Sequence, residues 1–309
     1  MDRGTESGRA VKYISVCSGI EAATQAWAPL GWEAVCFSEI EPFPCAVLAH
    51  HYPDVPNVGD MMTFDWKQYS GKADVVIGGT PCQSFSIAGL RGGLDDDRGN
   101  LTLKFVEVCN DVRPDFIVWE NVPGVLSDKT NAFGCLLAGL VGSDTPLVSP
   151  LERGRWTDSG MVAGPTRTAA WRVLNAQFFG LAQRRRRVFV ISCPRNGANP
   201  SEILFELKDL PGNIAKIRAR TLFCCDTGLR TYGRSSKNNV LIDIEADTAR
   251  LLTPLEEERA FGFQDNYTNI PYGRPRYPDQ ICPDGHRYRS LGNSMARSVM
   301  EWIGRRIAA

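Results

Sequence analysis

A thiol, a carboxyl and a guanidinium of this chain could act together in chemistry, and all three border apolar segments. Cys82 follows two glycines, a threonine and a proline after the apolar run 73–77, while Glu120 ends a second such run and Arg187 precedes a third. A thiolate can act as a nucleophile, and a buried carboxyl whose pKa is raised by desolvation can donate a proton. Cys82 is therefore a candidate nucleophile, and Glu120 is a candidate acid.

Each of these residues also has a simpler interpretation. A cysteine is often a small buried hydrophobic residue. Glu120 and Asn121 could cap the end of a strand, and an arginine run could serve general polyanion binding. The residues alone leave these alternatives open.

The segments that would carry these residues alternate between strand-like and helix-like patterns, which predicts an α/β fold with helices covering a sheet. Strands are expected at 13–16, 34–37, 73–77, 116–119, 171–174 and 188–191, and helices at 20–30, 42–51, 100–112 and 133–140. The rest of 127–168 is expected to be an irregular insertion. Because such sheets bind ligands at the carboxyl ends of their strands, we expect Cys82, Glu120 and Arg187 to share one cleft.

The chain changes character after about residue 194. Strand-like pieces at 203–207, 221–225 and 240–244 predict a small, mostly β domain. A helix is expected at 255–261, with Thr253 as its N-cap and Glu256 completing a capping box. A loop over 266–288 and a closing helix at 294–307 follow, the helix having Met295, Val299, Trp302 and Ile303 on one face.

A nucleotide-binding pattern lies near the N-terminus. Cys17, Ser18, Gly19 and Ile20 follow the first expected strand, and Glu39 ends the second, 20 residues after Gly19. A glycine lets backbone approach a ligand, and the acid can receive ribose hydroxyls. A single glycine favours a nucleoside-bearing ligand without a pyrophosphate. Asp60 could accept from an adenine amino group or could be a turn aspartate.

Composition limits the class of protein. The 309 residues are 43% hydrophobic and 23% charged, with a net charge of zero. Residues 1–150 hold 10 basic and 19 acidic residues, whereas 151–309 hold 25 and 16, so either a polyanion docks on the second half or that half has a solvated basic face. No apolar run could span a bilayer and no signal-peptide pattern is present, so a cytoplasmic protein is expected. Ten scattered cysteines without a C-x-x-C pair, and three histidines, predict no metal site.

Several motifs in order resemble those of the DNA (cytosine-5) methyltransferases, and the resemblance covers almost the whole chain. They are Ser15–Ala22, Gly79-Thr80-Pro81-Cys82-Gln83-Ser84-Phe85-Ser86, Asp97–Leu101, Glu120-Asn121-Val122, Gln183–Val188, Arg250–Phe263 and Leu291–Ser294. The arginine run and compact layout resemble phage- or prophage-borne members or restriction-modification types. The implied fold is a Rossmann-like mixed sheet with helices on both faces, plus a small, mostly β target-recognition domain.

The resemblance implies a role for each of the catalytic candidates. Cys82 would add to C6 of a flipped-out cytosine, which makes C5 nucleophilic toward the methyl group of S-adenosylmethionine. Glu120 would protonate ring N3, and Arg187 would hold O2 with support from Arg185. A base that the sequence does not identify would then remove the C5 proton, and S-adenosylhomocysteine would be the other product.

The resemblance also implies binding residues and boundaries. The cofactor residues would be Cys17, Ser18, Gly19, Ile20, Glu39, Ile40, Asp60, Pro81, Leu101, Asn293 and Ser294, and the DNA-binding residues would be Gln83, Ser86, Arg98, Arg230, Arg234 and Lys237. The catalytic domain would comprise 1–193 and 285–309, and the target-recognition domain 194–284, with DNA reading mainly in 194–250. The expected partner is double-stranded DNA, with a cognate restriction endonuclease as a further candidate. The expected protein is monomeric, metal-free and associated with the nucleoid through DNA.

One departure from the family pattern concerns the cofactor. The family usually has phenylalanine where Cys17 stands, and a smaller side chain could weaken or reshape cofactor binding, so a transferred group larger than methyl stays open. The rival interpretations are a cytosine-5 methyltransferase acting on transfer RNA, a catalytically silent DNA-binding relative, and a nicotinamide-dependent oxidoreductase. The incomplete glycine fingerprint argues against the oxidoreductase.

Overall fold

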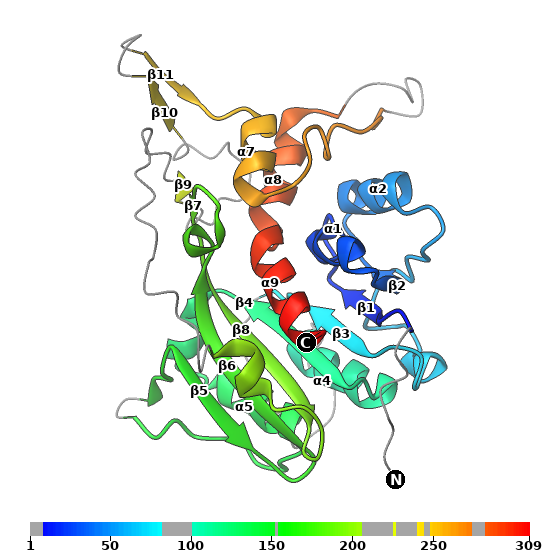
Figure 1. Cartoon of the computed structure of the whole chain (residues 1–309), viewed down its shortest axis with the longest axis vertical. Coiled ribbons are helices and arrows are strands. Elements are labelled where there is room, and N and C mark those ends of the chain that lie inside the picture. Colours follow the sequence, from blue (N-terminus) through cyan, green and yellow to red (C-terminus); the bar gives the residue numbers. More distant parts are fainter. Residues whose placement is uncertain are drawn as a thin grey trace.

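A seven-stranded sheet in the order β2-β1-β3-β4-β8-β6-β5 forms the centre of the protein (Figure 1). The structure is a computed structural model that describes residues 9–81, 101–151, 154–205, 225–226, 240–243, 248–273 and 282–309. The strands of this sheet are β1 (Lys12–Val16), β2 (Glu33–Ser38), β3 (Val75–Gly78), β4 (Phe116–Asn121), β5 (Ser159–Ala163), β6 (Arg167–Asn175) and β8 (Arg186–Pro194). Two smaller pairs are β7 (Gln183–Arg184) with β9 (Cys225–Asp226), and β10 (Val240–Asp243) with β11 (Thr248–Leu251).

The helices connect and flank these strands. They are α1 (Ala22–Trp27), α2 (Pro42–His51), α4 (Leu101–Val112), α5 (Ala132–Val141), α6 (Pro200–Leu204), α7 (Pro254–Phe261), α8 (Asp284–Asn293) and α9 (Arg297–Ile307). Short 3₁₀ segments are η1 (Ala28–Leu30), η2 (Trp66–Tyr69), η3 (Pro123–Ser127) and η5 (Ala176–Phe179). In the described part of the chain, no helix is both long and apolar enough to cross a membrane.

The sheet is mixed, as expected for the fold class. β2, β1, β3 and β4 pair in parallel, which the alternation of strands and helices in the first half predicts. β8 pairs antiparallel with both β4 and β6, and β5 pairs antiparallel with β6. The antiparallel direction of β8 matters for the site, because it brings the start of β8 to the carboxyl end of β4.

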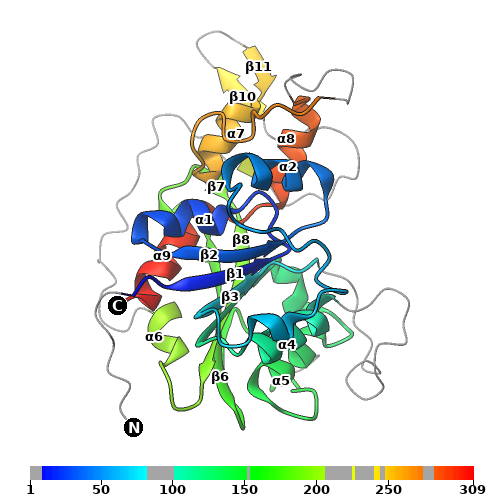
Figure 2. The same ribbon diagram turned by 90° about the vertical axis from the view of Figure 1, so that its right-hand side faces the viewer.

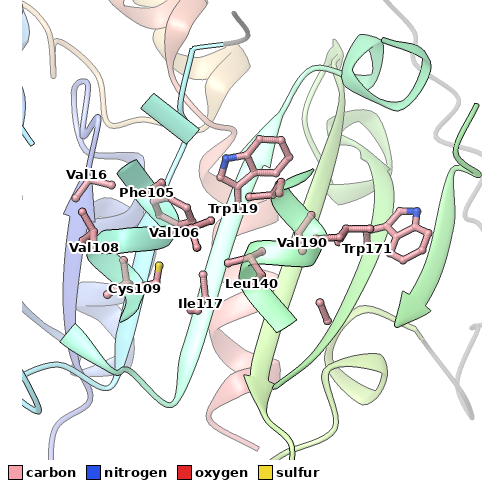
Figure 3. Close-up of a cluster of buried hydrophobic side chains, with 14 of the residues drawn as sticks. Val16, Phe105, Val106, Val108, Cys109, Ile117, Trp119, Leu140, Trp171 and Val190 are labelled. Carbon is pink, nitrogen blue, oxygen red and sulfur yellow. The ribbon is translucent and has the colours of Figure 1, made fainter. Parts of the chain in front are cut away.

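Alternating side chains of the strands point to opposite faces of the sheet and build two cores. On one face, Ile117 and Trp119 pack with Phe105 of α4 and Leu140 of α5 (Figure 3). On the other face, Val118 and its neighbours pack with α1, α6 and α9. Figure 2 shows these two helical layers on either side of the strands. Apolar residues on both faces explain why the parallel strands read as continuous apolar runs.

The path of the chain creates a ligand site at the end of β1. β2 lies on one side of β1, and β3 lies on the other. The loops that leave the carboxyl ends of β1 and β3 therefore run in opposite directions. Open α/β sheets bind ligands at such a switch point. The loop 17–21 follows β1, Glu39 follows β2, and Gly79 follows β3.

The C-terminal helices confirm two sequence predictions. Thr253 caps α7, and Glu256 returns the bond to the Thr253 backbone, which is a complete capping box. Within α9, Val299 and Ile303 are buried and Trp302 is half-buried in the same core. The closing helix begins at Arg297 and not at 294, so Met295 packs on this core from the segment before the helix.

Three sequence predictions were wrong in detail. Residues 203–204 belong to α6 and not to a strand, because Asn199 caps a helix that begins at Pro200. The expected irregular insertion contains the edge strand β5, whose half-exposed pattern hides the usual apolar signal. The expected loop over 266–288 ends earlier, since α8 begins at Asp284.

Candidate active site

Glu120 and Arg187 meet at the carboxyl end of β4, although 67 residues separate them. Glu120 pairs in register with Phe189 of the antiparallel strand β8, which places Arg187 just beyond it. Arg187 Nε lies 3.1 Å from Glu120 Oε1, and these side chains are only 14% and 10% exposed. The contact is an ion pair without hydrogen-bond geometry, so within the described structure Oε1 has no hydrogen-bond partner. A buried oxygen in this state is suited to bind a polar group of a ligand.

The electrostatics of this pair favour a protonated Glu120. Burial raises the pKa of the Glu120 carboxyl, and the nearby charges of Arg187 and then Arg185 oppose that shift. Desolvation is the larger effect, because the carboxyl lies in the interior at the strand end. Glu120 can therefore retain a proton at a higher pH than an ordinary glutamate.

Arg185 connects this site with the end of α8. Its guanidinium donates to the carbonyl oxygens of Gly292, at 3.2 Å, and Ser294, at 2.5 Å. It also lies 5.0 Å from the centre of the Phe261 ring. The side chain is 3% exposed, so it fixes the segment that holds Asn293 and Ser294 and does not offer a free surface charge.

Gly79 allows Glu120 to approach the turn after β3. A Cβ atom at Gly79 would lie 3.0 Å from Met295 Cε and 3.3 Å from Glu120 Oε2. These are tight contacts on two sides, so the absent side chain leaves space for Glu120 and the methyl group of Met295. Met295 is thus part of the site wall, which sequence reasoning placed only on an apolar helix face.

Thr80 anchors the turn that leads to Cys82. Its hydroxyl accepts from Trp119 Nε1 at 2.9 Å and lies 2.8 Å from Thr102 Oγ1, while its carbonyl accepts from Asn121 Nδ2 at 2.9 Å. All four of these residues are buried. β4 and the start of α4 thereby fix the backbone just before Pro81. The sequence offers no periodic signal for this cluster, since threonine at a strand end is compatible with many environments.

Thr80→Val should lower the free energy of unfolding by about 1–3 kcal/mol, because it keeps the shape but leaves buried donors without their acceptor. Urea unfolding of the purified variant measures this. Thr157→Val is the matched control, since the Thr157 hydroxyl bonds the Ser159 carbonyl at an exposed position. Equal losses in the two variants would contradict the special role of the Thr80 hydroxyl.

The loop after β1 is held by Glu39. Glu39 Oε2 accepts from the Gly19 amide at 2.7 Å, and Oε1 accepts from the amides of Ile40 and Glu41, both at 2.8 Å. Gly19 has φ +57°, and a Cβ there would meet nothing within 4 Å. The backbone at Gly19 therefore borders open space, as a ligand-binding loop requires.

The other side chains of this region suit a nucleoside-bearing cofactor. Ile40 is 65% exposed and offers an apolar surface, and Asp60 offers a carboxylate whose Oδ1 accepts from the Met62 amide at 2.9 Å. Cys17 is half-buried, with its Sγ 4.0 Å from Met61 Sδ, and burial raises the pKa of its thiol to about 12. An apolar face beside hydroxyl- and amine-binding carboxylates matches the chemistry of an adenosine moiety.

Some of the remaining predicted site residues lie within the described structure, and others lie outside it. Leu101 begins α4 and is half-buried, Ser294 is buried after α8, and Asn293 and Pro81 are exposed. Ser18 donates from its hydroxyl to the Ser15 carbonyl, and Ile20 is buried. The predicted residues Cys82, Gln83, Ser86, Arg98, Arg230, Arg234 and Lys237 lie outside the described residues. In the described parts, no cluster of three or more His, Cys, Asp or Glu side chains could hold a metal ion.

A Rossmann-like mixed sheet with a nucleoside-type site at the end of β1 is typical of S-adenosylmethionine-dependent methyltransferases. The family model of the C-5 cytosine-specific DNA methylases matches residues 11–139. A relative described as "Type II methyltransferase M.AquIA", from Picosynechococcus sp., is 33% identical over 58% of this chain and 71% of the relative. The chain belongs to the C-5 cytosine-specific DNA methylase family, whose methyl donor is S-adenosylmethionine.

Two further similarities extend over nearly the whole chain. A protein of Escherichia phage P1, described as "DNA N-6-adenine-methyltransferase", is 36% identical over 96% of this chain, and the chain spans 61% of that relative. The crystal structure of the S. pombe Dnmt2 methyltransferase superposes on this chain with a TM-score of 0.62 and 17% sequence identity. The match covers 96% of this chain and 98% of the Dnmt2 chain. The second similarity supports the fold.

Proposed function

We propose that this protein transfers a methyl group from S-adenosylmethionine to C5 of cytosine in double-stranded DNA, through a covalent bond between Cys82 Sγ and C6. The observation that carries this proposal is the buried Glu120–Arg187 pair beside the turn 79–81, with Glu120 Oε1 lacking a hydrogen-bond partner among the described residues. A carboxyl that keeps its proton fits a ring nitrogen and an exocyclic amine of cytosine. A guanidinium fits the carbonyl oxygen O2 of the base.

The chemistry follows from the weak nucleophilicity of C5. The Cys82 thiolate adds to C6 as protonated Glu120 passes its proton toward N3, and the electron pair of the C5–C6 bond becomes available at C5. S-adenosylmethionine supplies an electrophilic methyl group when bound. C5 takes this methyl group and S-adenosylhomocysteine is released. A base removes the C5 proton, the electrons of that bond expel the Cys82 thiolate, and N3 returns its proton to Glu120. Atoms and electrons balance without an oxidant or a metal.

The target base must leave the helix for this reaction to occur. Cytosine C6 is stacked in duplex DNA, so the base has to rotate into the site at the end of β4. The proposed target-recognition domain is 194–284, within the basic second half of the chain. The residues proposed to contact DNA are Gln83, Ser86, Arg98, Arg230, Arg234 and Lys237.

An adenine target is the second candidate, since the phage P1 relative is described as an N-6-adenine methyltransferase. The chain spans only 61% of that relative, and the portion of the relative without a counterpart here is a second place for the adenine activity. An exocyclic amine is itself the nucleophile and requires no thiolate addition to the ring. The arrangement of Glu120 and Arg187 beside the turn that leads to Cys82 therefore favours cytosine.

Cys82→Ala should abolish methyl transfer to duplex DNA. The experiment supplies labelled S-adenosylmethionine with duplex DNA or with transfer RNA and then identifies the modified base by mass spectrometry. The expected product is 5-methylcytosine in DNA. Cys135→Ala is the matched control, because Cys135 is a buried thiol within α5.

The same experiment separates the alternatives. Label in transfer RNA alone would favour the RNA-modifying rival, and N6-methyladenine would favour the adenine rival. No transfer to any substrate would favour a silent DNA-binding relative. DNA containing 5-fluorocytosine should remain covalently attached at Cys82, because fluorine cannot leave C5 as a proton does. Methylation that survives Cys82→Ala would overturn the proposal.

A further inference from the structure

The loop after β1 adopts a backbone conformation that needs external support. Cys17 has φ +51° and Glu21 has φ +61°, and both are non-glycine residues in the left-handed region within five positions. Side chains with a Cβ rarely adopt this conformation, because it costs conformational free energy. Contacts from other segments must therefore hold the loop 17–21 in its shape.

One such contact comes from the far end of the chain. Tyr267 lies after α7, and its hydroxyl donates to the Ile20 carbonyl at 2.7 Å. Its ring is 3% exposed and belongs to the same apolar cluster as Ile20, Phe43 and Phe261. Burial raises the pKa of Tyr267 well above its usual value, so the hydroxyl keeps its proton and remains a donor.

The same tyrosine also holds α2, which begins just after Glu39 and Ile40. His51 Nε2 donates to the Tyr267 carbonyl at 2.7 Å, and the two rings stack with centres 4.2 Å apart. Figure 2 shows α2 beside α8, above α1. Tyr267 thus contacts the loop 17–21 directly, and it contacts the C-terminal end of the helix whose first residues follow Ile40.

A directed series of hydrogen bonds supports the Tyr267 hydroxyl. Because it donates to Ile20, it accepts from Tyr52 Oη at 3.1 Å, and Tyr52 Oη in turn accepts from Gln25 Nε2 at 2.8 Å. Hydrogen bonds aligned in one direction polarise and strengthen one another. Gln25 lies in α1, so the series begins and ends on the segment that starts with the cofactor loop.

We propose that Tyr267 is a positioning residue for the cofactor, which holds the loop 17–21 and the C-terminal end of α2 in the binding-competent arrangement. The inference rests on the proposed function only in taking S-adenosylmethionine as the ligand. It also links the cofactor site to the segment that follows α7 within the proposed target-recognition domain. Tyr267 acts through Ile20 and His51 and does not itself touch the reacting atoms.

Tyr267→Phe tests this role, and Tyr288→Phe is a closely matched control. Tyr288 Oη donates to the Leu252 carbonyl at the same distance of 2.7 Å, in the same C-terminal part of the chain. Titration calorimetry with S-adenosylmethionine and with S-adenosylhomocysteine measures affinity without requiring turnover. Tyr267→Phe should weaken both by about tenfold, which corresponds to about 1.4 kcal/mol. Tyr288→Phe should leave both affinities within about twofold.

Two further measurements separate positioning from general stability. Amide hydrogen exchange of residues 18–21 in the free protein should be faster in Tyr267→Phe and unchanged in Tyr288→Phe. The KM for S-adenosylmethionine should rise while kcat changes little. If the two variants bound the cofactor with equal affinity, the inference would be overturned and the proposed function would stand. Failure of the unsubstituted protein to bind the cofactor would overturn the proposed function together with it.

Discussion

Glu120→Gln should lower kcat for methyl transfer by about 10²- to 10⁴-fold, the usual contribution of a positioned acid. Glutamine has nearly the same shape and can still fill the space beside Gly79. It cannot deliver a proton to N3 of the target base, and its amide no longer forms an ion pair with Arg187. Single-turnover methylation of a DNA duplex at saturating cofactor measures the change.

The pH dependence should identify Glu120 as the acid. Burial raises the pKa of this carboxyl in the folded protein, and Arg187 and Arg185 only partly offset the increase. Since the protonated form is the active one, the single-turnover rate should be highest below that pKa and should fall as pH rises through it. Glu120→Gln should lack this descending limb, because an amide does not titrate.

Glu107→Gln serves as the control for the loss of a carboxylate. Glu107 lies on α4, its side chain is 44% exposed, and its carboxylate pairs with Lys104 at 3.1 Å. This variant should keep the rate and the pH profile of the unsubstituted protein. A Glu120→Gln enzyme that retained the descending limb would assign that limb to another group and would remove Glu120 from the acid role.

Much of the site framework could be predicted from the sequence, because apolar runs identified the strands and polar residues marked their ends. The positions of Glu39, Gly79 and Glu120 at carboxyl ends followed from the parallel order alone. The approach of Arg187 to Glu120 was expected from the rim of the sheet. Its geometric cause, an antiparallel β8, has no signature in the apolar run 188–191.

The contacts that support the site could not be predicted in the same way. Thr80 and Trp119 form a buried cluster through side-chain hydrogen bonds, and neither residue departs from ordinary strand composition. Tyr267 reaches Ile20 across 247 positions of sequence, in a segment that appeared to be a loop. Periodicity reports which face of an element is buried, but it does not report which polar atoms meet inside.

Arg287→Ala should lower the free energy of unfolding by about 3–5 kcal/mol, because it leaves the buried carboxylate of Glu258 without its cation. Arg287 Nη2 lies 3.1 Å from Glu258 Oε1, and the two side chains are 9% and 0% exposed. Glu258 also accepts from the backbone amides of Asn266 and Thr268, at 2.7 and 2.8 Å. The carboxylate therefore stays in place when the guanidinium is removed. Urea unfolding measures the loss.

A neighbouring ion pair supplies the comparison. Arg259 and Asp265 form a contact at 2.5 Å on the same part of the chain, but their side chains are 59% and 49% exposed. Arg259→Ala should change stability far less, because water and salt screen exposed charges. Adding Glu258→Gln to Arg287→Ala should restore part of the lost stability, since a neutral amide is easier to bury without a partner. If the two arginine variants lost equal stability, burial would not be the cause.

The Glu258–Arg287 pair also bears on catalysis through its position. It joins α7 to α8, and α8 ends at Asn293, next to the carbonyls of Gly292 and Ser294 that Arg185 binds. Loss of the pair should therefore loosen the end of α8 and weaken cofactor binding before the whole protein unfolds. Cofactor affinity in Arg287→Ala should fall at a temperature where its fluorescence still reports a folded chain. It should recover when Glu258→Gln is added, because the unpaired charge is then gone. A recovery of stability without a recovery of affinity would separate the α7–α8 contact from the cofactor site.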